Sequence, residues 1–143
     1  MLRWLLRLAD AARHRARRRK WAAHEALGRR GEDLAHRYLE DKGLRVVARN
    51  YRPPSGSGEV DLIAWDGPTL VLVEVKSRTS QQVAAPERNV DREKLRSMVR
   101  AGRDYARRTG TPWERVRLDV VSVVVEGRPA IRHLRDAFRV KTL

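Results

Sequence analysis

The 143-residue sequence contains no cysteine and no long apolar run. Without cysteine the chain can form neither a disulfide nor a thiolate zinc site, which suits a cytoplasmic location. No stretch approaches the roughly 18 uninterrupted apolar residues of a membrane span, so a membrane is not the partner we expect. Residues 1–10 are short and broken by arginine, and they lack the small-residue cleavage site of a signal peptide. The length predicts one ordinary domain with its own core.

Acidic residues are scarce beside basic ones, with 18 Asp and Glu against 32 Lys and Arg, for a net charge of +14. Residues 1–30 hold ten of the basic residues and two of the acidic ones, a net charge of +8. A strongly basic protein is drawn to polyanions because binding releases counterions. The charge therefore indicates a nucleic-acid partner, with acidic membranes, ribosomes and simple solubility as alternatives.

The N-terminal part of the chain differs from the rest. We interpret residues 1–22 as a basic extension, either an amphipathic helix or a disordered tail, and residues 23–143 as the domain. Apolar residues recur at helical spacing near the start, and residues 13–20 are nearly all basic. Such a segment can lie on nucleic acid or on an anionic lipid surface. The alternative is a solvated extension with no fixed role.

The periodicity of the remaining chain predicts two helices and five strands. The helices are expected over about 24–42 and 91–108, each with one apolar stripe, and Gly43 is placed to end the first. Gly28 and Gly31 in that helix suggest the close approach of another backbone. Strands are expected over 44–51, 59–65, 70–78, 116–125 and, shorter, 130–133. Strands interleaved with helices predict an α/β fold around a mixed sheet.

A hairpin sets the register of the second and third strands. Residues 66–69 (DGPT) have the composition of a hairpin turn. If Trp65 and Leu70 close this turn, Asp61 lies opposite Glu74 on the paired strands. Side chains alternate along a strand, so Asp61 and Glu74 share one face of the sheet with Glu59 and Lys76. The opposite face is then apolar core, made of Val60, Leu62, Val71, Val73 and Val75.

Two opposed carboxylates need compensation. At about 4 Å and an effective dielectric constant near 20, their repulsion is roughly 4 kcal/mol, which a shared proton, a lysine or a cation must offset. Oxygen ligands without histidine or cysteine favour Mg²⁺ or Mn²⁺. Lys76 is placed to stabilise phosphate charge or to position an attacking water. The alternative is an exposed strand pair in which Lys76 forms ordinary ion pairs; pairing with Lys76 is sufficient to explain Glu59.

A family resemblance is carried by several motifs together. The pattern GE-V-DLI followed by VEVKSR, preceded by LGRRGEDLAHRYLEDKGL and RNYR, resembles the YraN-like family of small bacterial proteins. That family is similar to archaeal Holliday-junction resolvases and belongs to the restriction-endonuclease-like, PD-(D/E)XK group. The resemblance covers about residues 27–125. It implies a three-layer α/β fold with a central mixed β-sheet flanked by helices.

The resemblance also implies roles for single residues. Asp61 and Glu74 would be metal ligands together with the carbonyl oxygen of Val75, and Lys76 would be the catalytic lysine. Glu32 matches the acidic residue that such folds bring to the metal from the first helix. A glutamate early in a helix also favours the helix N-terminus electrostatically, which is the alternative for Glu32.

Basic residues outside this cluster are candidates for contact with phosphate. Arg78 and Lys94 match basic positions of the family pattern, and we add Arg52 and Arg100 as residues that would hold a nucleic-acid backbone. An exposed charge without a role is the alternative. Asp119 is expected to form a salt bridge. The four histidines show no spacing typical of metal ligands.

These observations predict a cytoplasmic hydrolase. We expect a Mg²⁺- or Mn²⁺-dependent endonuclease-like protein that hydrolyses phosphodiester bonds in DNA, with Glu32, Asp61, Glu74 and Lys76 as its catalytic set. The similarity to resolvases brings branched or structured DNA and a homodimer into consideration. The alternative is a non-catalytic nucleic-acid-binding module that retains the nuclease fold.

Overall fold

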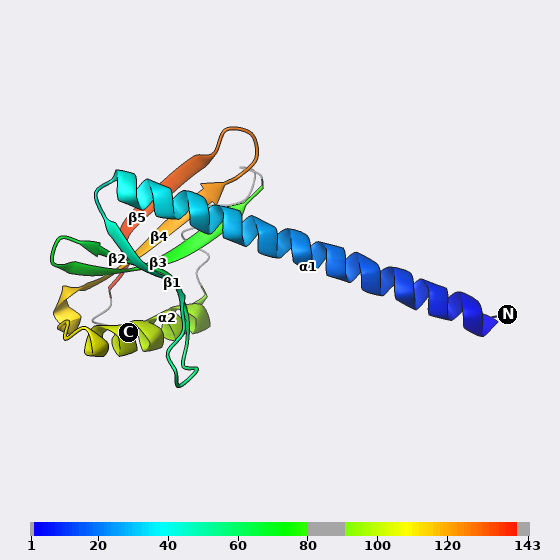
Figure 1. Ribbon diagram of the computed structural model, residues 1–143, viewed down its shortest axis with the longest axis horizontal. Helices are drawn as coiled ribbons and strands as arrows, with labels where there is room; N and C mark the ends of the chain where they lie inside the picture. The colour runs from blue at the N-terminus through cyan, green and yellow to red at the C-terminus, as the bar shows by residue number, and fades with distance from the viewer. Residues whose placement is uncertain (1, 80–90, 140–143) are drawn as a thin grey trace.

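The computed structural model describes residues 2–79 and 91–139 and has an α/β architecture (Figure 1). In chain order the elements are α1 (Leu2–Asp41), β1 (Arg45–Tyr51), β2 (Val60–Asp66), β3 (Thr69–Arg78), α2 (Arg92–Arg108), the 3₁₀ turn η2 (Trp113–Arg115), β4 (Val116–Val124) and β5 (Ala130–Phe138). The strands form one sheet in the order β1-β2-β3-β4-β5. β3 and β4 are parallel and the other neighbours are antiparallel, which confirms the predicted mixed sheet.

The two helices lie on opposite faces of the sheet (Figure 1). The C-terminal half of α1 packs through Ala35 and Leu39 on a cluster that includes Leu62, Val71 and Val73. On the other face, α2 packs on a second cluster, which includes Ile63, Leu72, Met98 and Leu118. The result is a three-layer fold of the restriction-endonuclease-like type, as expected. Val60 belongs to the α2-side cluster, so its predicted place on the face of Leu62 is wrong.

Helix α1 is longer than the sequence predicted. A separate start near residue 24 was expected, but α1 runs without interruption from Leu2 to Asp41. Residues 20–26 contain no glycine or proline, so nothing there breaks the helix. The helix ends as expected at Gly43, whose φ is 91°. The N–H of Leu44 donates to the Leu39 carbonyl at 3.0 Å and that of Gly43 to the Glu40 carbonyl at 2.9 Å, a Schellman motif.

The glycines of α1 differ in their surroundings. A Cβ built on Gly31 would lie 2.7 Å from the Cβ of Ser77 on β3, so the absence of a side chain lets α1 approach the sheet. A Cβ built on Gly28 would have no neighbour within 4 Å. The predicted close approach is therefore confirmed at Gly31 and wrong at Gly28, because the helix is already leaving the sheet one turn earlier.

The first four predicted strands match the observed ones to within one residue at each end, but β5 extends to Phe138. The pairing of β4 with β5 shifts between Leu118 and Val120, and Asp136 has a φ of 50°. This irregularity disrupts the apolar alternation that marks a strand in sequence. Within residues 2–79 and 91–139, none of the helices combines the length and the apolar character needed to span a membrane.

Candidate functional site

The predicted hairpin register is confirmed. Trp65 pairs with Leu70 and Ile63 with Leu72 in the ladder of β2 and β3. Asp66 also pairs with Thr69, so the turn itself consists of two residues, Gly67 and Pro68. The ladder continues to the pair Leu62 and Val73, which leaves Asp61 and Glu74 next along the two strands.

Asp61 interacts with the backbone of β3. Its Oδ2 accepts a hydrogen bond of 2.8 Å from the N–H of Val75. The Asp61 carboxylate thus lies just beyond the last pair of the β2–β3 ladder and is held beside the side chain of Glu74. Asp61 is held in place by a backbone donor, which does not depend on the rotamer of another side chain.

Glu74 is the least satisfied buried group of the site. It is 1% exposed, and neither of its carboxylate oxygens has a hydrogen bond of good geometry within the described residues. The ammonium nitrogen of Lys94 lies 2.7 Å from Oε1, a short ionic contact from the first turn of α2. Buried polar atoms are nearly always hydrogen-bonded, so a carboxylate left in this state indicates a site for a further group.

Burial and neighbouring charges shift the pKa values of Asp61 and Lys94. Burial, followed by the negative charge of Glu74, raises the pKa of Asp61 to about 7. For Lys94, burial lowers the pKa, but the short contact with the negatively charged Glu74, with smaller contributions from Asp61 and Glu59, raises it by more, so the net shift is upward. Asp61 is therefore partly protonated near neutral pH, and Lys94 is cationic beside it.

Glu32 lies next to this pair without joining it. Its Oε2 accepts a hydrogen bond from Asn50 Nδ2 at 3.1 Å, and the guanidinium of Arg49 lies 3.6 Å away. Burial raises the pKa of Glu32, and the negative charge of Asp61 contributes in the same direction. Because α1 begins at Leu2, Glu32 lies far from a helix N-terminus, which removes the alternative explanation for it.

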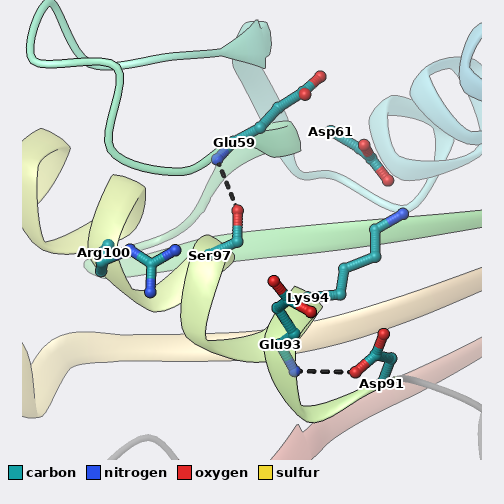
Figure 2. A pocket seen from close by; sticks show the side chains of 7 residues that line it. All are labelled: Glu59, Asp61, Asp91, Glu93, Lys94, Ser97 and Arg100. Carbon is teal, nitrogen blue, oxygen red and sulfur yellow. Dashed lines mark hydrogen bonds between the residues drawn. The ribbon is translucent and has the colours of Figure 1, made fainter.

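A hollow of about 480 Å³ opens beside Asp61, between the start of β2 and α2 (Figure 2). Its lining is mainly polar and charged: Glu59, Asp61, Asp91, Glu93, Lys94, Ser97 and Arg100. The N–H of Glu59 donates to Ser97 Oγ at 3.1 Å, which ties the start of β2 to α2. Figure 2 shows the Lys94 side chain reaching across the hollow toward Asp61.

The predicted basic residues fall at different places. Lys94 and Arg100 line the hollow, and Arg52 contacts Glu59, an acidic residue of its lining, at 2.9 Å. The structure thus gives Glu59 an ion-pair partner, Arg52, that the sequence did not suggest. Arg78 is the last residue of β3. Lys76, half-buried on the same strand, follows Glu74 at the spacing of two that places both on one face.

The donor set can be tested against a metal ion. In residues 2–79 and 91–139 no group of three or more His, Cys, Asp or Glu side chains is close enough together to hold one. Asp61 and Glu74 therefore stand as a pair, with the Val75 carbonyl as the remaining predicted ligand. Mg²⁺ commonly uses one or two carboxylates and completes its octahedron with water and phosphate oxygens. The unsatisfied oxygens of Glu74 fit such an ion.

Further interactions of the folded chain also escaped prediction. His133 Nε2 lies 2.8 Å from Asp119, which also forms the expected salt bridge, with Arg117. The contact of Lys94 with Glu74 was also missed. A signal for it was present, since Lys94 precedes the buried Met98 by four residues and so lies on the same stripe of α2.

Similar proteins agree with the resemblance seen in the motifs. A family model described as "Uncharacterised protein family UPF0102" matches residues 31–123. A UPF0102 protein of Solibacter usitatus (strain Ellin6076) is 50% identical over 138 residues, which cover 96% of this chain and 100% of the relative. One of Rhodococcus jostii (strain RHA1) is 45% identical over 115 residues, 79% of this chain and 96% of the relative. The chain therefore belongs to the YraN-like family UPF0102.

Proposed function

We propose that this protein is a metal-dependent endonuclease-like hydrolase that cleaves phosphodiester bonds in DNA. The observation that carries the proposal is the buried pair of Asp61 and Glu74, in which both Glu74 oxygens lack a hydrogen bond of good geometry. A protein that needed only a fold would gain by neutralising or pairing such a carboxylate completely.

The proposed chemistry assigns a task to each residue. Asp61, Glu74 and the Val75 carbonyl would hold Mg²⁺ or Mn²⁺. When bound, such an ion polarises a phosphoryl oxygen and lowers the pKa of the attacking water. Lys76 would stabilise the negative charge that develops on the phosphate as water attacks phosphorus and the bond to the leaving sugar oxygen breaks. Glu32, beside Asp61, would orient that water.

Lys94 has two roles in this scheme. Its ammonium group contacts Glu74 at 2.7 Å and supplies positive charge where the ion would bind. With a divalent ion on the carboxylates, Lys94 would be released toward the hollow that it lines with Arg100. There both residues, with Arg52 and Arg78, would contact the phosphates of the DNA backbone.

The test of catalysis is a panel of duplex, flap, four-way-junction and single-stranded DNA substrates in Mg²⁺ or Mn²⁺. Lys76→Ala should abolish cleavage and leave DNA binding nearly unchanged. Lys42→Ala, which removes an exposed lysine at the end of α1, is the matched control and should cleave like the wild type. Cleavage by Lys76→Ala at the wild-type rate would refute the catalytic assignment.

A second candidate is a non-catalytic nucleic-acid-binding module. The observation favouring it is that Lys94 already offsets part of the charge on the carboxylate pair, while the described residues contain no three-ligand metal group. This candidate predicts DNA binding that is unaffected by divalent ions and no cleavage of any substrate in the panel.

The proposal of a DNA-cleaving hydrolase also includes a homodimer and a cytoplasmic location. Light scattering with and without a four-way junction tests the homodimer.

A further inference from the structure

Among residues 2–79 and 91–139, the N-terminal half of α1 has no packing partner. Residues 4–26 are exposed, and burial of α1 begins only at Leu27. Figure 1 shows this half projecting far from the sheet as a straight helix. The family model starts at residue 31, so the projecting segment lies outside the part that defines the family. The relative from Rhodococcus jostii is matched along 96% of its own length by 115 residues and so has no room for so long an addition, whereas the one from Solibacter usitatus is matched over 138 residues.

The far end of this helix exposes large apolar side chains. Trp4, Leu5, Leu6 and Leu8 are 64%, 53%, 55% and 49% exposed, and we call these four residues the apolar tip. Leu8 lies three and four residues after Leu5 and Trp4, so these three form one continuous surface. Helical spacing places Leu6 between Leu5 and Asp10 around the helix, while Arg7 and Asp10, three residues apart, lie away from Leu8. The tip is therefore amphipathic and not merely apolar.

A dense positive charge follows the tip directly. Six of the eight residues from 13 to 20 are basic and none is acidic, and we call these six the basic collar: Arg13, Arg15, Arg17, Arg18, Arg19 and Lys20. At a rise of about 1.5 Å per residue, the collar begins roughly 7.5 Å beyond the tip. Trp21, next to the collar, is 69% exposed. An apolar surface and a cationic surface thus adjoin on a single helix.

Three kinds of partner can be compared with this arrangement. A second copy of the helix could cover the tip but would bring two basic collars together. A nucleic acid would match the collar and leave the aromatic and leucine side chains in water. A lipid bilayer with anionic headgroups satisfies both at once, because apolar side chains enter the boundary of the acyl region while arginine and lysine stay among the headgroups.

We propose that residues 2–24 bind the surface of an anionic membrane, with the apolar tip inserted and the basic collar on the headgroups. This contact runs along one leaflet and is distinct from a span. It stabilises the projecting helix, whose residues 4–26 are exposed and do not pack on the part of the domain that the structure describes. The domain would then be tethered to the membrane with its sheet and carboxylate pair free. The inference does not depend on the proposed nuclease activity.

Vesicle flotation of the full-length protein tests the proposal. Vesicles of phosphatidylcholine alone are compared with vesicles containing 30% phosphatidylglycerol, in 0.1 M and 0.5 M NaCl. We expect binding to the anionic vesicles only, weakened by salt because the attraction is screened. The substitution Arg17→Gln/Arg18→Gln/Arg19→Gln should reduce partitioning by roughly a hundredfold, at about fivefold for each charge removed.

Separate variants address the tip and the controls. Trp4→Ser/Leu8→Ser should abolish flotation without changing the melting temperature, since the tip makes no contact with the domain. Brominated lipid should quench the tryptophan fluorescence of the wild type, and Trp4→Phe should remove most of that quenching. The charge-matched control Arg92→Gln/Arg96→Gln/Arg128→Gln, three exposed arginines of the domain, should float like the wild type.

Three results would overturn the proposal. The first is equal flotation of the wild type and both N-terminal variants. The second is self-association of the wild type, seen by sedimentation velocity, that disappears in Trp4→Ser/Leu8→Ser, because the tip would then bind a second copy. The third is a loss of DNA binding in that tip variant with no change in flotation, which would assign the tip to nucleic acid.

Discussion

The two faces of the sheet each bury carboxylates, and they treat them in opposite ways. Asp119 lies on the α1 side, next to Val73 in the parallel register, and is fully buried. Asp61 and Glu74 lie on the α2 side, beside Lys94. Burial is nearly the same for Asp119 and Glu74, so burial alone does not separate a structural carboxylate from a candidate functional one.

Asp119 and Glu74 differ in their hydrogen bonding. Asp119 accepts two hydrogen bonds from Arg117, at 2.8 and 3.1 Å, and one of 3.0 Å from the N–H of Asp136, and it lies 2.8 Å from His133. Burial raises its pKa, but these partners outweigh burial and hold the pKa below its usual value. Glu74 has no such set of donors, and the pKa of Asp61 is raised to about 7. The comparison identifies Asp119 as structural and the pair as available to a ligand.

The largest expected effect is the loss of stability on substitution of Asp119. Asp119→Ala should lower the free energy of unfolding by about 3–5 kcal/mol, because it leaves Arg117 and His133 without their buried partner. Chemical denaturation measures this change. The response to Mg²⁺ should persist in whatever fraction stays folded. Glu126→Ala, at an exposed turn, is the control, and a loss at Asp119 no larger than that of the control would contradict the structural role.

Glu74→Gln should leave the stability without metal almost unchanged and abolish the stabilisation by Mg²⁺, the opposite of Asp119→Ala. We expect its stability without metal to stay within about 1 kcal/mol of the wild type, because the lost contact with Lys94 is offset by relief of the repulsion from Asp61. The stabilisation of the wild type by Mg²⁺, about 2.7 kcal/mol at a hundred times the Kd, should vanish. Thermal unfolding with and without metal measures both. Glu93→Gln, from the same hollow, should respond like the wild type; an equal response in Glu74→Gln would exclude the site.

The raised pKa of Asp61 predicts a pH dependence. The ordinary pKa of the carboxyl is 3.8 and its pKa in the folded protein is about 7, so the folded state holds the proton more tightly. The stability that follows is present at acidic pH and is lost as the pH rises through about 7, on the order of 2 kcal/mol. Asp61→Asn should remove this loss. Denaturation from pH 5 to 8 without divalent ions measures it, and parallel curves for the two proteins would contradict the assignment.

The smallest expected effect is at Lys94. Lys94→Met should raise the affinity for Mg²⁺ roughly 1.4- to fivefold, the range that corresponds to a partly exposed ion pair of about 0.2–1 kcal/mol. Calorimetric titration measures the affinity, with Lys42→Met as control. A lower affinity in Lys94→Met would mean that this lysine supports the metal-bound state and does not compete with the ion.

Much of this arrangement could be predicted from local pattern. The register of β2 and β3 follows from the DGPT turn and the alternation of apolar residues, and this register alone places Asp61 next to Glu74. The end of α1 at Gly43 and the stripe of α2 were predictable for the same reason. These features depend on residues close in sequence or joined by a short turn.

Contacts set by side-chain rotamers could not be predicted in this way. They include the hydrogen bond of Glu32 with Asn50, the pair of Glu59 with Arg52, and the contacts of Asp119 with His133 and the N–H of Asp136. Composition and spacing leave these rotamers open. Nor did periodicity predict that α1 continues as one helix from Leu2, since the tail and the domain differ in composition but not in helix propensity.

The sequence by itself determined the family, the α/β class, the hairpin register and the meeting of two carboxylates. Only the tertiary structure decided that Glu74 would be buried without donors of good geometry while Asp119 received a full set. The physical reason is that a carboxylate's environment is set by the elements that pack around it in the folded chain. α2 brings Lys94 to the pair, whereas β4, β5 and the backbone of Asp136 surround Asp119.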